Sequence, residues 1–175
     1  MFQFRKSTLQ DMDQIVRIAE EGRALLKSRG ISQWQTGSYP DRPLFEQDVQ
    51  EGIGYVVCEE GRVAAICALQ ITPEEDYRHL TEGRWLTGEG IFYAAVHRAA
   101  VAPECQGRHV TTFLFDSAAK TAKGMGAASL RADTHPDNIP MQKSLERAGF
   151  KKCGQFVISE GDEAGGIRLA YERLL

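Results

Sequence analysis

Residues 97–126, HRAAVAPECQGRHVTTFLFDSAAKTAKGMG, combine residue types and spacing that suit the binding of an anion. The pattern predicts a strand at Tyr93–Ala102, a tight loop at Glu104–Arg108 and a helix from about His109 to Lys123. The first backbone N–H groups of a helix lack intrahelical partners and carry a partial positive charge, so they suit a phosphate or pyrophosphate. The glycine of the loop would let the backbone approach the ligand, and its arginine would add a positive charge. An ordinary strand-to-helix turn that binds nothing is the alternative, because one glycine is weak evidence.

The composition argues against several classes of partner. The 175 residues carry a net charge of −3 and no basic run longer than two residues, so we expect no nucleic-acid partner. No apolar stretch approaches the roughly 20 residues of a membrane span, and the N-terminus lacks the apolar segment of a signal peptide. The four cysteines lack the spacing of metal ligands, so we expect no metal site and a reducing, cytoplasmic setting.

The rest of the sequence predicts one α/β domain over residues 1–175. The expected order is β, α, α, β, β, β, α, β, α, β, β, which favours a mixed sheet with helices on both faces. Ser7 or Thr8 is expected to cap the first helix together with Asp11, and Gly22 to break it. The other predicted elements are a helix capped by Asp41 that ends at Gly52, a hairpin of 55–59 with 63–71, an irregular segment 72–90, a strand 127–134, a helix 139–148 that ends at Gly149, and a hairpin of 152–159 with 167–175.

Two motifs in this order resemble signatures of the GNAT acyltransferase superfamily. Val101–Thr111 (VAPECQGRHVT) is similar to its acetyl-CoA loop, Val-x-Pro followed by Gln/Arg-x-x-Gly-x-Gly/Ala. Asn138–Phe150 (NIPMQKSLERAGF) resembles its Asn-x-x-Ala-x-x-Leu-Tyr-x-x-x-Gly-Phe. The two motifs at this separation are more specific than either alone. The chain departs from them at His109 and Thr111, where the family prefers Gly and Gly or Ala, and at Leu145, where many members have a Tyr general acid.

The resemblance implies a fold and a cofactor. The GNAT fold has a mixed central sheet of about six to seven strands with helices on both faces. Its fourth and fifth strands splay apart, and the pantetheine arm of acetyl-CoA enters the splay. The implied cofactor-binding residues are Ala99, Ala100 and Val101 along the arm, the backbone of Gln106, Gly107, Arg108, His109, Val110 and Thr111 at the pyrophosphate, and Asn138 and Met141. A backbone N–H near Val101 would stabilise the oxyanion, and Asn138 has the role of a plain helix cap as its alternative.

The base and the acid of the reaction come from the same comparison. In the family the base, or the residue that holds a base water, often lies on the strand before the loop. Alternation places Tyr93, Ala95, His97, Ala99 and Val101 on one face of that strand. Among these, His97 has an ordinary pKa near neutrality and is the first candidate for the base; a His packed under the loop is the alternative. Weaker candidates are Asp133, Glu89, His135 and a water chain. Tyr93, Tyr171 or solvent could supply the acid that Leu145 cannot.

The acceptor side is less marked in the sequence. The loop of residues 31–42 holds Trp34 and Tyr39, and the segment 72–90 holds Tyr77, Trp85 and Glu89. In GNAT folds the segment between the first two helices commonly borders the acceptor, so we expect Trp34 and Tyr39 to contact it. Trp85 and Asp133 are further candidates for contact with the acceptor. The alternatives are a loop that packs on the core and a solvated excursion with one buried Trp.

These observations favour an N-acetyltransferase that transfers acetyl from acetyl-CoA to the amine of a small molecule or amino acid derivative. Direct attack in a ternary complex would need no metal. The absence of an acidic tract argues against a polyamine acceptor. By analogy the protein would form a homodimer. The alternative is a non-catalytic GNAT-fold module that binds CoA or another ligand, a hypothesis to which the departures at His109, Thr111 and Leu145 contribute.

Overall fold

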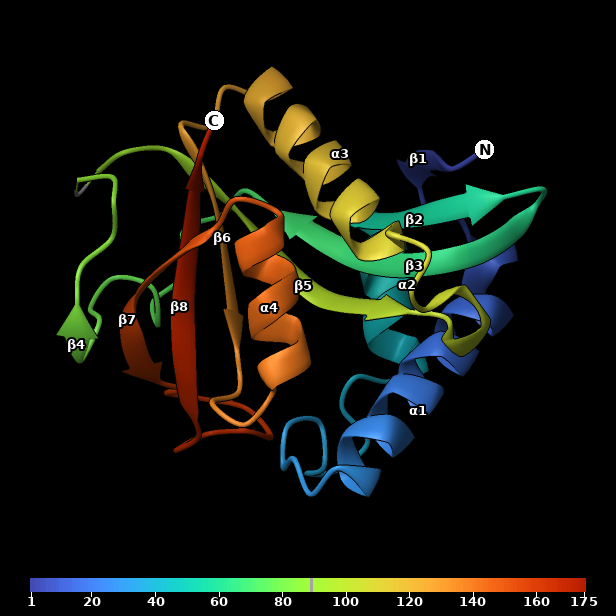
Figure 1. The fold of residues 1–175 in the computed structure, drawn as a ribbon, viewed down its shortest axis with the longest axis horizontal. Coiled ribbons are helices and arrows are strands. Elements are labelled where there is room, and N and C mark those ends of the chain that lie inside the picture. Colours follow the sequence, from blue (N-terminus) through green and yellow to red (C-terminus); the bar gives the residue numbers. More distant parts are fainter. Residues whose placement is uncertain (89) are drawn as a thin grey trace.

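The computed structural model describes residues 1–88 and 90–175 and contains an eight-stranded mixed sheet with helices on both faces (Figure 1). The strand order is β1-β2-β3-β5-β6-β8-β7-β4. The strands are β1 (Gln3–Lys6), β2 (Gly54–Glu59), β3 (Arg62–Gln70), β4 (Glu82–Gly83), β5 (Tyr93–Val101), β6 (Ser129–Thr134), β7 (Lys151–Val157) and β8 (Ile167–Leu174), and the helices are α1 (Met12–Ser28), α2 (Arg42–Gln50), α3 (Val110–Gly124) and α4 (Ile139–Arg147).

The predicted fold class and element order are confirmed, with one addition. The two-residue strand β4 lies within the segment predicted to be irregular, and it pairs with the edge strand β7. The sheet therefore has eight strands rather than six or seven, and the predicted fourth and fifth strands correspond to β5 and β6.

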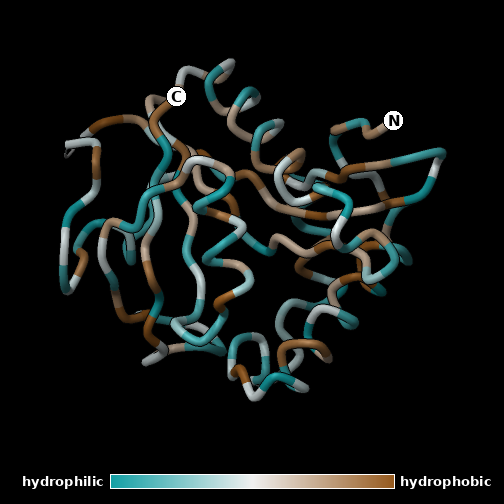
Figure 2. Tube along the Cα trace, viewed as in Figure 1, coloured by the Kyte–Doolittle hydropathy of each residue, from teal (hydrophilic) through white to brown (hydrophobic). Residues whose placement is uncertain are grey.

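The helices form a layer on each face of the sheet. In Figure 1, α3 and α4 lie in front of the strands and α2 lies behind them, and α1 contacts α2, β3 and β5. Apolar residues follow the central strands and hydrophilic residues cover the outer loops (Figure 2), as expected for strands buried on both faces. In β3 every residue from Val63 to Leu69 is buried. Within the part of the chain that the structure describes, no helix is long and apolar enough to cross a membrane.

The start of α1 follows the predicted capping pattern, but its middle does not break. The carboxylate of Asp11 accepts a hydrogen bond from the backbone N–H of Thr8 at 2.8 Å and forms two bonds of 2.8 Å with Arg5. The helix continues through Gly22, contrary to the prediction, because tertiary packing outweighs the low helix propensity of one glycine. A Cβ at Gly22 would lie 3.5 Å from the Trp34 ring. This distance is an ordinary van der Waals contact, so the packing of Trp34 on α1 does not require a glycine here.

Strands β5 and β6 are paired over only part of their length. Their parallel pairing runs from Tyr93 opposite Ser129 to Val96 opposite Ala132 and goes no further. On its other side β5 is irregular between Ala68, which pairs with His97, and Ile66, which pairs with Ala100. Arg98 lies in this bulge with φ 54°. The predicted splay is therefore present, and it coincides with a bulge that redirects the side chains of β5.

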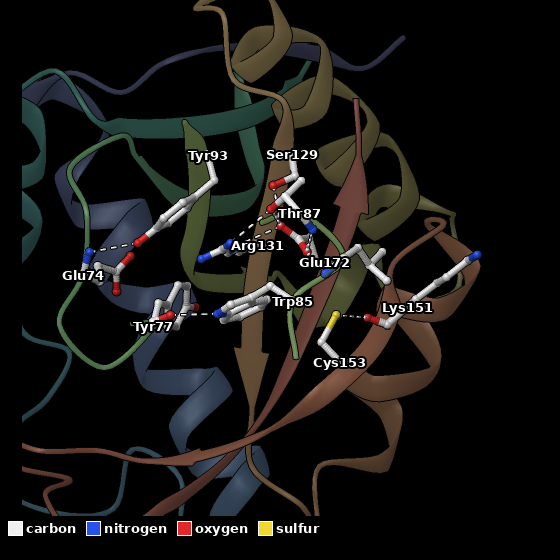
Figure 3. A network of polar contacts seen from close by, with 11 residues as sticks. Glu74, Tyr77, Trp85, Thr87, Tyr93, Ser129, Arg131, Lys151, Cys153 and Glu172 are labelled. Atoms are coloured by element: carbon white, nitrogen blue, oxygen red, sulfur yellow. Dashed lines mark hydrogen bonds and ion pairs between the residues drawn. The ribbon is translucent and has the colours of Figure 1, made fainter. Parts of the chain in front are cut away.

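A buried polar network fastens residues 85–87 onto the sheet (Figure 3). The carboxylate of Glu172 accepts hydrogen bonds from the Ser129 hydroxyl at 2.6 Å, from Arg131 Nε at 3.0 Å and from the backbone N–H of Thr87 at 3.1 Å. The Arg131 guanidinium lies 4.0 Å from the ring centroid of Trp85 and 3.9 Å from that of Tyr93, a double cation–π contact. Burial alone would raise the pKa of Glu172, but these hydrogen bonds lower it.

Replacing Asp11 with Asn should reduce the free energy of unfolding by about 1–2 kcal/mol, because it removes a cap and a two-pronged ion pair. Hydrogen bonds from Arg5 hold the pKa of Asp11 at about 2, below the ordinary 3.8. A depressed pKa stabilises the fold above pH 3.8, and this contribution is lost as the pH falls through 2. Urea unfolding at several pH values measures both effects. Asp13→Asn, at an exposed carboxylate, is the matched control; equal losses in both variants would contradict the assignment.

Replacing Glu172 with Gln should cost about 3 kcal/mol or more, because it leaves the buried Arg131 charge without its counter-charge. The segment carrying Trp85 and Thr87 should become sensitive to limited proteolysis before the rest of the protein. Denaturant unfolding and mass spectrometry of the fragments provide the measurements. Glu82→Gln, at an exposed glutamate of β4, is expected to leave both unchanged. First cleavage elsewhere would show that this network does not fasten the segment.

Candidate active site

A cavity of about 870 Å³ opens where β5 and β6 part. Its walls come from β5, the loop after β5, the starts of α3 and α4, the end of β6, and the loops 31–39 and 158–163. Of the residues predicted for the site, the cavity is lined by Trp34, Tyr39, His97, Ala99, Ala100, Val101, Gln106, Gly107, His109, Val110, Thr111, Asp133, Asn138 and Met141. Residues from both predicted motifs thus meet at one concave surface.

The loop before α3 contains left-handed backbone conformations, which a residue with a side chain adopts less readily than glycine does. His109 has φ 60° and Gly107 φ 77°. His109 therefore adopts the conformation for which a glycine is usually preferred, at some conformational cost. The backbone N–H groups of Gln106 and Arg108 donate to Pro103 and Cys105 within the turn. These two N–H groups, which were predicted to bind the anion, are therefore already paired. The first turn of α3 retains the unpaired N–H groups expected of a helix start.

Contrary to the prediction, Arg108 does not line the cavity. Its guanidinium pairs with Glu59 at 2.6 Å and lies 5.5 Å from the ring centroid of Phe2. The left-handed residue that follows it, His109, directs the chain into α3. Arg108 therefore fastens the loop to β2, and any contact with a ligand would require its side chain to turn.

The end of β6 and the start of α4 add polar groups to the same wall. The Asn138 carbonyl accepts a hydrogen bond from the backbone N–H of Met141 at 3.3 Å, so this residue is the cap of α4. Its amide donates to Gln33 at 3.0 Å. The hydroxyl of Thr134, a cavity-lining residue that the sequence reasoning missed, is buried and has no hydrogen-bond partner among the described residues.

His97 lies between two carboxylates. Its Nε2 is 2.7 Å from Glu74 Oε1, and its Nδ1 is 3.9 Å from Asp133 Oδ2. The Tyr77 hydroxyl donates to Asp133 Oδ2 at 2.7 Å. Burial would lower the pKa of His97, and so would the neighbouring Arg98, but Glu74 and Asp133 together raise it. Burial also raises the pKa of Asp133. The imidazole is thus held in one orientation beside the splay.

The bulge in β5 corrects the predicted alternation of side chains. Because the bulge inserts a residue, the side chains of Ala99 and Val101 no longer alternate onto the same face of the strand as that of His97. Arg98, expected on the opposite face, lines the cavity together with His97 and forms a two-pronged pair with Asp48, at 3.0 and 2.7 Å. Asp48 is buried, so the charge of Arg98 is largely compensated. No short sequence pattern marks this bulge.

Two loops that are distant in the sequence meet across the cavity. The backbone N–H of Trp34 donates to Glu163 at 2.6 Å, and Glu163 also pairs with Arg168 at 2.8 Å. Arg168 lies 3.7 Å from Asp133. The loop between α1 and α2 is thereby joined to the β7–β8 hairpin across the cavity. Glu163 and Arg168 were not predicted, because long-range partners leave no local pattern.

Several predicted residues lie outside the cavity. The Tyr93 hydroxyl accepts a hydrogen bond from the backbone N–H of Glu74 at 2.9 Å, and the Trp85 indole donates to the Tyr77 carbonyl at 2.7 Å (Figure 3). Both rings form cation–π contacts with the Arg131 guanidinium. The structure therefore does not support Tyr93 as the acid or Trp85 as an acceptor contact. Tyr171 and His135 also lie elsewhere, with partners in Gln142 and Ser32. Glu89 falls outside the described residues.

Comparisons with known proteins agree with this geometry. The sequence model of the Acetyltransferase (GNAT) family matches residues 18–150. A GNAT acetyltransferase structure from Streptococcus agalactiae is 30% identical with a TM-score of 0.88, covering 99% of this chain and 95% of that one. One from Listeria monocytogenes is 20% identical with a TM-score of 0.73, covering 99% and 95%.

A more distant fold match carries a ligand. N-acetylglutamate synthase from Neisseria gonorrhoeae, solved with coenzyme A and N-acetyl-glutamate, is 16% identical with a TM-score of 0.67, and the match covers 100% of this chain and 35% of that one. A search of curated proteins gave no significant match. The family match spans most of the chain and agrees with the splayed strands and the loop before α3. The protein is therefore a member of the GNAT acetyltransferase family.

Proposed function

We propose that the protein transfers the acetyl group of acetyl-CoA to the amine of a small molecule or amino acid derivative, by direct attack in a ternary complex. The observation that carries this proposal is the position of His97, a partly buried imidazole that lines the cavity where β5 and β6 part. Family membership supports the acetyl transfer, and the fold match solved with coenzyme A supports the cofactor.

The residues present fit this co-substrate. The start of α3 suits the pyrophosphate because its unpaired backbone N–H groups can donate hydrogen bonds to an anion. The end of β5, from His97 to Val101, pairs with β3 but not with β6, so its free side can offer backbone hydrogen bonds to the amides of an extended chain. The co-substrate supplies the activated acyl carbon; the protein positions the amine against it and excludes water.

His97 is the base in this proposal. An aliphatic amine is an ammonium ion at neutral pH and must lose a proton before it can attack a carbonyl carbon. A neutral imidazole beside the amine can take that proton. Leu145, which is fully buried, stands where many relatives have a tyrosine acid, and it has no proton to donate. A thiol leaving group is itself acidic, with an ordinary pKa of about 8.5, and can leave without a dedicated donor.

The first test is the release of free thiol from acetyl-CoA over a panel of aliphatic amines, amino acids and short peptides. His97→Gln should lower kcat by about 10²–10⁴-fold and leave acetyl-CoA binding, measured by calorimetry, unchanged. His79→Gln, at an exposed histidine of the same segment as Glu74, is the matched control. Binding of acetyl-CoA with no turnover of any amine would favour the non-catalytic module, and a fully active His97→Gln enzyme would remove His97 as the base.

The pH profile gives an independent check. As a base, His97 must be neutral, so kcat/KM should rise with pH through its pKa in the free enzyme. Because the flanking carboxylates raise this pKa above the ordinary 6.5, the midpoint of the rise should lie above pH 6.5. Initial rates between pH 5 and 9 at low amine concentration measure it, with values corrected for the ionisation of the amine. A midpoint below 6.5 would contradict the assignment.

A further inference from the structure

We propose that Glu74 is a positioning residue that fixes the tautomer and the basicity of His97, and that Asp133, oriented by Tyr77, binds the acceptor as an ammonium ion. This inference rests on the proposed function and extends it to residues of three separate segments. Glu74 follows β3, Asp133 lies on β6, and Tyr77 belongs to the segment that the Arg131 network fastens.

The tautomer follows from the hydrogen-bond geometry. A carboxylate can only accept, so the 2.7 Å contact between Glu74 Oε1 and His97 Nε2 places a hydrogen on Nε2. In the neutral imidazole the lone pair then belongs to Nδ1. Nδ1 faces Asp133, and both side chains line the cavity. The proton-accepting atom of His97 is therefore Nδ1.

The position of the acceptor nitrogen follows from one distance. Nδ1 and Asp133 Oδ2 are 3.9 Å apart, too far for a direct hydrogen bond. A nitrogen about 2.9 Å from each atom would complete a triangle with them, which is an ordinary hydrogen-bond distance to both. An ammonium group at this apex donates one hydrogen to Asp133 and one to Nδ1. The Tyr77 hydroxyl already donates to the same Asp133 oxygen, so the carboxylate cannot rotate without losing that bond.

The proton and electron balance is complete with these groups. One proton passes from the ammonium nitrogen to Nδ1, and the electron pair that it leaves forms the C–N bond to the acyl carbon. The C–S electron pair departs with the sulfur. The second proton lost by the nitrogen goes to that sulfur, and the proton on Nδ1 returns to solvent. The acceptor class that fits is an aliphatic primary amine that binds in its charged form.

Among the described residues, few charged groups lie near His97. Glu74 and Asp133 flank its two nitrogens, and Arg98 is its neighbour on β5. Arg98 is compensated by Asp48, and Arg168 contacts Asp133 from β8. Tyr77 is neutral, since burial raises its pKa well above the ordinary value. Glu74 is thus the carboxylate in direct contact with the imidazole, and removing its charge should change the His97 pKa more than any other substitution that keeps the shape of the site.

The decisive comparison is Glu74→Gln against Glu75→Gln. Glu75 is the adjacent, exposed glutamate and, among the described residues, forms an ion pair with Arg78 alone, so it controls for the loss of one negative charge in the same segment. The His97 pKa is measured by NMR titration of the imidazole in the protein without ligands. We expect a fall of about one unit or more in Glu74→Gln and none in Glu75→Gln. In the enzyme assay the midpoint of the kcat/KM profile should move down by the same amount, and kcat should fall at least about tenfold.

A conservative variant keeps the test independent of folding. Glu74→Asp retains the charge, so the His97 pKa should remain above 6.5 and part of kcat should return. Asp133→Asn should raise KM for the amine about tenfold or more, with a smaller change in kcat. An unchanged His97 pKa in a folded Glu74→Gln protein overturns the role of Glu74. A fall in the pKa without movement of the rate profile overturns the base role of Nδ1 while the acetyltransferase stands. Absence of turnover in the unaltered protein overturns the proposed function instead.

Discussion

The early end of pairing between β5 and β6 is the constraint on which the rest of the site depends. After Val96 and Ala132 the two strands no longer share hydrogen bonds, which leaves backbone groups of β5 available in the middle of a sheet. Such groups are costly unless a ligand or water satisfies them. The separation also creates the cavity, whose lining includes the start of α3, His97 and Arg98. A continuously paired sheet would have none of these features.

A second constraint is the buried charge network around Arg131, because it positions a segment with little regular structure. Residues 71–88 contain only the short strand β4, yet Glu74 and Tyr77 hold fixed positions beside His97. Trp85 contacts both Arg131 and Tyr77, so the aromatic stack transmits the position of the Glu172–Arg131 pair to the site. Buried ion pairs contribute little net stability, but breaking one is costly. The arrangement therefore fixes the position of a polar loop relative to the sheet beneath it.

The sequence was informative wherever one local signal determined the structure. The caps at Thr8, Asp41 and Asn138, the loop before α3 and the element order could all be predicted, because each depends on neighbouring residues. The prediction was wrong where distant contacts decide. Packing against Trp34 continues α1 through Gly22, and a bulge changes the phase of β5. The roles of Glu74, Glu163 and Arg168 depend on partners from other strands and loops, so no local spacing of residues predicts them.

The two carboxylates beside His97 cannot contribute to catalysis in the same way. An aliphatic amine has a pKa near 10.4 and an ordinary histidine one near 6.5, so proton transfer between them is uphill by roughly 5 kcal/mol. Asp133 would contact the ammonium before transfer and the imidazolium after it, so its charge stabilises both states and mainly strengthens binding. The Glu74 carboxylate would contact the imidazole and not the amine, so its charge would favour the state that follows transfer. Only a difference between the two states accelerates the reaction. In the proposed mechanism, Glu74 at 2.7 Å from Nε2 would tune the base, whereas Asp133 at 3.9 Å from Nδ1 would hold the substrate.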